Sequence, residues 1–171
     1  MAWSVNNDLI NGNDMWLYLV DLGTGGTMTS GMVQDAQVLA YSQSCSLEVN
    51  ADTLDVTTKL SCRWNAVKPG NASYTVSSDN LYCLKANAEA NSAMTIDDLF
   101  QYLVDGENIG WVLAQDSSSD CGTVGGPDTT RPYYFGEAAV TSLSITAGNN
   151  EIVSSSITLT GSGEVKFSTG S

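Results

Sequence analysis

Apolar and polar residues alternate along most of the chain, which is the pattern of half-buried β-strands. The alternation is clearest near the C-terminus, where residues 143–147 and 152–160 flank a Gly-Asn-Asn turn. These two segments predict a hairpin with apolar side chains on one face and Ser or Thr on the other. Similar strands are predicted within residues 38–57 and 73–77. Residues 16–20 and 109–114 are continuously apolar and are predicted to be buried strands.

One segment has the periodicity of a helix. Apolar residues recur at the spacing of a single helix face at Ile96, Leu99, Phe100 and Leu103. Thr95 precedes this stripe as an N-cap, Asp98 lies in the first turn, and Gly106 follows the last turn. We therefore predict a helix over residues 96–104 that covers one face of a sheet.

The length of 171 residues fits one domain with its own hydrophobic core. Residues 1–14 are rich in Asn and Asp and are expected to form a flexible N-terminal arm. A loop is predicted over residues 58–71, and a long surface loop over residues 115–132, which are rich in Ser, Asp, Gly and Thr. The expected fold is a single, mainly β domain, a sandwich or barrel with one flanking α-helix.

The charge balance narrows the possible functions. Six Lys and Arg stand against nineteen Asp and Glu, which gives a formal net charge of -13 at pH 7. Nucleic-acid binding is disfavoured, because it requires clustered cations that displace the counterions of the phosphate backbone. The N-terminus has no secretory signal pattern, and no segment has about 20 consecutive apolar residues, so we expect no membrane association and folding in the cytoplasm.

The residues that usually carry catalysis are scarce. The chain has no histidine, which removes the commonest acid/base at neutral pH and the commonest metal ligand. The four cysteines, Cys45, Cys62, Cys83 and Cys121, do not show the CxxC spacing of zinc or redox sites. They are expected to be free, mostly buried thiols rather than disulfides. With no candidate pair of nucleophile and base, we expect neither an enzyme nor a cofactor.

The order of several segments resembles the siphophage major tail protein family. The segments are Cys45-Ser-Leu-Glu-Val-Asn-Ala-Asp-Thr-Leu-Asp-Val-Thr-Thr-Lys59, the Trp64 to Gly70 loop, the strand of residues 73–82, the helix of residues 95–107 and the hairpin of residues 139–161. The resemblance implies a β-sandwich flanked by a helix, with residues 58–71 as the ring-stacking loop. It also implies hexameric rings whose inner strands join into a lumenal barrel.

The same resemblance implies partners and a location. The protein would self-assemble as a homo-oligomer into a tube of stacked rings, through which DNA passes without specific binding. Its other partners would be the tail terminator, the tape measure protein and the baseplate or tail-tip proteins. The location would be the tail of the virion, after assembly in the host cytoplasm.

Two groups of residues are candidates for roles in such a tube. Lys59, Arg63 and Lys68 are half of all basic residues and lie with Trp64 and Pro69 in the predicted stacking loop, where they would dock on the acidic face of a neighbouring ring. The alternative is an ordinary solvated loop. Glu48, Asp52 and Asp55 lie on the polar sides of predicted strands. They either line the tube and repel DNA or simply increase solubility.

A different class of function also fits the strand pattern. A β-sandwich binding module, such as a virion decoration protein or a carbohydrate-binding domain, would use residues 115–134 as its recognition loop. Assembly into rings or tubes would distinguish the tube subunit from a module that stays monomeric.

Overall fold

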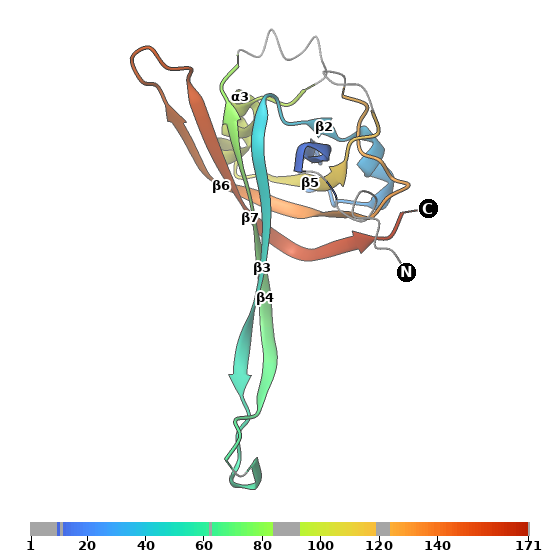
Figure 1. Ribbon diagram of the computed structural model, residues 1–171, viewed down its shortest axis with the longest axis vertical. Coiled ribbons are helices and arrows are strands. Elements are labelled where there is room, and N and C mark those ends of the chain that lie inside the picture. The colour runs from blue at the N-terminus through green and yellow to red at the C-terminus, as the bar shows by residue number, and fades with distance from the viewer. Residues whose placement is uncertain (1–9, 11, 62, 84–92, 119–123, 171) are drawn as a thin grey trace, which may run out of the picture.

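The computed structural model describes residues 10, 12–61, 63–83, 93–118 and 124–170, which form a head with a long, narrow arm (Figure 1). Seven strands make one continuous sheet in the order β2-β1-β5-β6-β7-β4-β3, and each neighbouring pair is antiparallel. The strands are β1 (Met15–Val20), β2 (Gln37–Val38), β3 (Ser42–Asp55), β4 (Val67–Leu81), β5 (Asn108–Gln115), β6 (Tyr133–Thr146) and β7 (Ser154–Ser168).

The sheet curls until its two ends approach each other. β1 lies near one end of the strand order and β3 at the other, yet the Cys45 thiol of β3 donates a hydrogen bond to the Met15 carbonyl of β1 at 3.7 Å. Side chains from β1, β4, β5, β6 and β7 fill the space inside the curl. The expected mainly β, sandwich- or barrel-like fold is confirmed.

The neighbouring strands β1 and β5 are buried on both faces. Leu17 and Leu19 point into the curl, whereas Tyr18 and Val20 pack on the other side. That outer side is covered by residues 21–36, which include the short 3-10 helix η2 (Ser30–Asp35) and the buried Val33. Burial on both faces explains why these strands are continuously apolar in sequence.

The helix α3 (Ile96–Asp105) forms where its pattern predicts it. The Asp98 carboxylate accepts hydrogen bonds from the Thr95 backbone nitrogen at 3.0 Å and from the Thr95 hydroxyl at 2.8 Å. Gly106 ends the helix with φ of 68°. The predicted apolar stripe is only half buried: Ile96 and Leu99 pack into the core, but Phe100 and Leu103 are exposed.

The predicted loops differ from the structure in one important place. β4 begins at Val67, so Lys68, Pro69 and the two residues after them belong to a strand and the connecting loop is confined to residues 56–66. A strand tolerates Pro69 here because the register with β3 shifts between Ala51 and Thr53, next to this position. The connection from β5 to β6 spans residues 116–132, of which residues 119–123 lie outside the described part.

Most of the predicted N-terminal arm also lies outside the described residues. From that segment the structure describes residue 10 and residues 12–14, which form the 3-10 turn η1 (Gly12–Asp14) that leads into β1. Cys45 and Cys83 are free thiols, as predicted, and burial raises the pKa of both. Cys62 and Cys121 fall outside the described residues. Among the helices that the structure describes, none is both long and apolar enough to cross a membrane.

Candidate assembly surfaces

One face of the four neighbouring strands β6, β7, β4 and β3 is covered by small hydroxyl side chains. Because side chains alternate between the faces of a sheet, the core-facing positions are separated by polar ones. The strand register aligns these polar residues in rows across the four strands. The rows are Ser142, Thr158, Ser77 and Ser46; then Ser144, Ser156, Asp79 and Ser44; then Thr160, Thr75 and Glu48. We call this surface the hydroxyl face.

Neighbouring groups on the hydroxyl face bond to one another. The hydroxyls of Ser46 and Ser77 lie 2.7 Å apart, and Ser44 donates to the Asp79 carboxylate at 2.9 Å. These hydrogen bonds connect short side chains of neighbouring strands to one another. The three rows contain two charged residues, the carboxylates Glu48 and Asp79, and no Lys or Arg. The face is therefore polar and weakly negative.

This four-stranded part of the sheet has an open edge on each side. On one side, β3 ends the strand order and is paired only with β4 in the described structure. On the other side, β5 pairs with β6 only at residues 134–139, so residues 141–146 of β6 extend beyond it. Open edges present backbone donors and acceptors that template pairing with another strand.

The arm consists of residues 50–73 and is the longest projection of the molecule (Figure 1). β4 pairs with β7 only from Thr75 onward, so the outer parts of β3 and β4 pair with each other alone. At the arm tip, residues 56–66, Leu60 is 93% exposed and Trp64 is 79% exposed. Lys59 and Arg63 lie beside them in sequence. Exposed apolar side chains next to cations are typical of a contact surface.

All five predicted stacking residues lie on the arm, but not all at its tip. Lys59, Arg63 and Trp64 are in the tip, whereas Lys68 and Pro69 lie in β4 opposite Leu54 and Thr53 of β3. The sequence pattern placed all five residues in one loop, because Pro69 and the following glycine suggested that the loop continues to residue 71.

The three predicted lumen residues do not share one surface. Glu48 lies on the hydroxyl face opposite Thr75. Asp52 and Asp55 are on the arm, where the Thr57 backbone nitrogen donates to the Asp55 carboxylate at 2.8 Å. The hydroxyl and backbone donors of Thr57 lower the pKa of Asp55. Asp79 was missed, although it continues the polar alternation of Ser73, Thr75 and Ser77.

The connection between β5 and β6 is fastened to the head at both described ends. The Asp116 carboxylate accepts hydrogen bonds from the Tyr18 hydroxyl at 3.0 Å and from the Gly125 backbone nitrogen at 2.9 Å. Burial, together with this carboxylate, raises the pKa of Tyr18 far above its usual range. Arg131 forms a salt bridge with Asp128 at 3.3 Å and also bonds Gln115. The predicted recognition loop is thus partly a structural strap.

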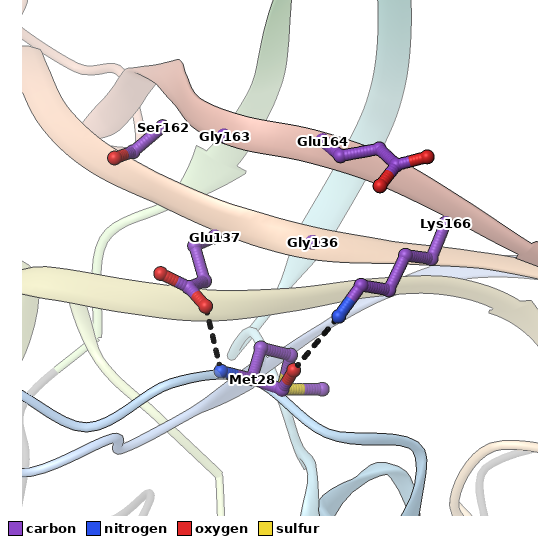
Figure 2. Close-up of a pocket in the computed structure, with 7 residues that line it drawn as sticks. All are labelled: Met28, Gly136, Glu137, Ser162, Gly163, Glu164 and Lys166. Atoms are coloured by element: carbon purple, nitrogen blue, oxygen red, sulfur yellow. Dashed lines mark hydrogen bonds between the residues drawn. The ribbon is translucent and has the colours of Figure 1, made fainter.

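A small pocket of about 130 Å³ lies between β6, β7 and the segment that precedes η2 (Figure 2). The Glu137 carboxylate accepts a hydrogen bond from the Met28 backbone nitrogen at 2.8 Å, and the Lys166 ammonium donates to the Met28 carbonyl at 3.5 Å. Figure 2 shows both side chains reaching the main chain of Met28, one at its nitrogen and the other at its carbonyl oxygen. Their observed contacts fasten residues 21–29 over the sheet.

Three solved assemblies contain chains with this fold. The tail of an empty gene transfer agent particle with C6 symmetry matches with a TM-score of 0.65 and 20% identity, over 94% of this chain and 99% of that chain. The SPP1 tail tube matches with a TM-score of 0.62 and 15% identity, over 95% and 80%. An extracellular contractile injection system, the PVC sheath-tube complex, matches with a TM-score of 0.55 and 14% identity, over 98% and 99%.

The sequence itself decides the family. No curated protein matches it closely enough to count as a relative. The family described as phage tail tube protein matches residues 9–167, which is nearly the whole chain and includes all seven strands except the last residue of β7. The chain therefore belongs to the phage tail tube protein family.

Proposed function

We propose that this protein is the non-catalytic major subunit of a tail tube, in which copies pair side by side into rings and the rings stack into a DNA-conducting bore. The observation that carries the proposal is the pair of open edges on the four-stranded sheet of β6, β7, β4 and β3. A sheet that is open on both sides and polar on one face extends naturally into a barrel by pairing with further copies.

In the proposed ring, β3 of one copy lies beside residues 141–146 of β6 in the next copy. The gene transfer agent tail has C6 symmetry, which supports six copies per ring. Six copies of four strands give about 24 strands, and a spacing of about 4.8 Å makes the circumference about 115 Å. The corresponding diameter is about 37 Å before strand tilt widens it. Such a bore is wide enough for a DNA duplex.

The hydroxyl face lines this bore. Its short hydroxyl groups already bond to one another, and Glu48 and Asp79 place carboxylates near the passing phosphates. Binding DNA would require cations, so a neutral to acidic wall lets the duplex slide. On this arrangement Glu48 is the lumen residue among the three candidates, while Asp52 and Asp55 belong to the contact between rings.

The arm makes the contact between rings. The arm tip docks on the neighbouring ring through Lys59, Arg63 and Trp64. The paired strands behind the tip, which contain Lys68 and Pro69, hold it in position. Copies of a chain with a formal net charge of -13 repel one another. Cations at the docking point reduce this repulsion at the contact between two rings. The remaining partners follow from the family: a tail terminator, a tape measure protein, and baseplate or tail-tip proteins. Assembly takes place in the host cytoplasm, and the mature location is the virion tail.

Negative-stain imaging of the concentrated protein tests the proposal. Rings with six-fold symmetry, or tubes built from them, are the expected result. Particles that stay monomeric at every concentration and bind glycans would instead identify the β-sandwich binding module. Sedimentation velocity on the same samples counts the copies in a ring.

A further inference from the structure

The outer face of α3 is an apolar surface that the fold of one copy leaves open. Phe100 is 54% exposed and Val104 is 63% exposed. They are four residues apart and therefore adjacent on the helix surface, and the partly exposed Leu103 lies next to them. Exposed Phe and Val beside each other on a helix are typical of a surface that another chain covers.

Carboxylates border this apolar surface at both ends. Asp97 lies in the first turn of α3 and Asp105 in the last turn. Asp97 accepts a hydrogen bond from the Tyr82 hydroxyl at 3.1 Å, and Asp105 accepts one from the Gln101 side chain at 2.9 Å. Both carboxylates keep further acceptor positions, because an ionised carboxylate takes about four hydrogen bonds. The surface formed by Phe100, Val104 and these carboxylates is here called the α3 patch.

The arm tip has the complementary composition. Leu60 and Trp64 are its most exposed apolar side chains, and the cations Lys59 and Arg63 stand next to them in sequence. An apolar centre bordered by cations fits an apolar centre bordered by carboxylates, since opposite charges set the register while the apolar contact provides the affinity. Trp and Arg are the residue types that most often dominate interfaces.

The two surfaces also lie where stacking requires them. The arm points away from the head, and α3 lies near the upper end of β3 and β4, at the opposite end of the long axis from the arm tip (Figure 1). A contact between different surfaces at opposite ends of a subunit is head-to-tail, and such contacts repeat without limit along one axis. Rings related in this way form a tube.

We propose that the α3 patch receives the arm tip of a copy in the next ring. The inference rests on the proposed function and adds the surface on the next ring that receives the arm tip. Because six contacts act together between two rings, a fivefold weakening of each multiplies to about 10⁴-fold. Substitutions on either surface are therefore expected to abolish stacking while rings persist.

Two double variants and their mixture test the proposal. Phe100→Ser with Val104→Ser removes the receptor, and Leu60→Ser with Trp64→Ser removes the tip. All four side chains are more than half exposed, so circular dichroism and the melting temperature of the monomer should match the wild type. Val124→Ser, which removes an exposed apolar side chain elsewhere on the head, is the matched control and should form normal tubes.

Electron microscopy is expected to show single rings for each double variant. The mixture should contain stacks of two rings, because the variant without a receptor still has a tip and the variant without a tip still has a receptor. Tubes formed by the receptor variant would overturn the inference. Its failure to form rings would also overturn the inference by assigning the α3 patch to the lateral contact. Mixtures that stay as single rings would show that the two surfaces serve different contacts. If the wild type forms neither rings nor tubes, the proposed function fails and this inference fails with it.

Charge reversal provides an independent readout. Arg63→Glu and Asp105→Lys should each raise the protein concentration needed for tubes more than about tenfold, and their combination should bring it back to within about twofold. A lysine in the last turn suits the helix dipole, so Asp105→Lys keeps α3 folded. Asp35→Lys makes the same change of charge at an exposed position elsewhere and serves as the control. No rescue in the combined variant contradicts the pairing of tip and patch.

Discussion

Replacing each of two tryptophans by alanine should separate assembly from folding. Trp64 at the arm tip is 79% exposed, so about 200 Å² of its surface is open to cover. At about 25 cal/mol per Å², covering this whole surface would contribute up to about 5 kcal/mol. Tryptophans at interfaces commonly account for about 2–4 kcal/mol of binding free energy, and we take about 2 kcal/mol for each Trp64 contact. Six such contacts give about 12 kcal/mol between two rings. Trp64→Ala should therefore abolish tubes.

The same substitution at Trp111 is expected to destabilise the fold of the monomer. Trp111 is fully buried in the curl, where its ring centroid lies 5.5 Å from that of Tyr74 and its indole nitrogen donates to the Tyr74 hydroxyl at 3.4 Å. Its removal should cost about 3–5 kcal/mol of folding free energy. For a chain of this size the melting temperature should fall by about 6–20 °C, whereas Trp64→Ala should change it by less than about 2 °C.

Two assays distinguish these outcomes. Calorimetry or circular dichroism on dilute monomer gives the melting temperature, and light scattering against concentration gives the threshold for tube formation. The reasoning is refuted if Trp64→Ala forms tubes at the wild-type threshold. It is equally refuted if Trp64→Ala melts as early as Trp111→Ala, since the arm tip would then be part of the folded core.

Three further predictions concern the core, the bore and acid stability. In Gly161→Ala the new Cβ would lie 2.3 Å from the Tyr74 ring, so the free energy of unfolding measured with denaturant should fall by about 2–3 kcal/mol. The control Gly12→Ala places its Cβ in open space and should leave this free energy unchanged. Ser156→Lys should still allow tubes but make them retain DNA in filter binding at low salt and release it at high salt; DNA that never binds would argue against a lumenal hydroxyl face. Hydrogen bonds from the Tyr102 hydroxyl and a backbone nitrogen lower the pKa of Asp21, so its contribution to stability is complete above its ordinary pKa and is lost as the pH falls through the lowered value. Asp21→Asn should accordingly flatten the loss of melting temperature between about pH 4 and pH 2, and an unchanged acid profile would contradict this role.

Local patterns were sufficient for the elements of the fold. The C-terminal hairpin followed from the alternation of apolar residues with Ser and Thr, and Ser155, Ile157 and Leu159 indeed share the buried face. The helix followed from its stripe and its caps at Thr95 and Gly106. These features depend on neighbours within a few residues, which is why one sequence reveals them.

Long-range pairings could not be read in the same way. The hydroxyl face exists because β4 pairs with β7, which places Thr75 beside Thr160, 85 positions later in the chain. Asp79 comes to lie beside Ser156 through the same pairing and was therefore not recognised. Residues 67–71 were assigned to the loop because Pro69 and a following glycine are turn signals, whereas the shifted register of β3 lets a strand accommodate them.

A reconstruction of the assembled tube by electron cryomicroscopy tests the central claim most directly. The measurement is the distance between β3 of one copy and residues 141–146 of β6 in its lateral neighbour, together with the position of Asp79. A spacing of about 4.8 Å between these strands, with Asp79 facing the bore, is the predicted result. A ring in which β3 keeps an open edge, or in which α3 rather than the hydroxyl face lines the bore, would contradict it.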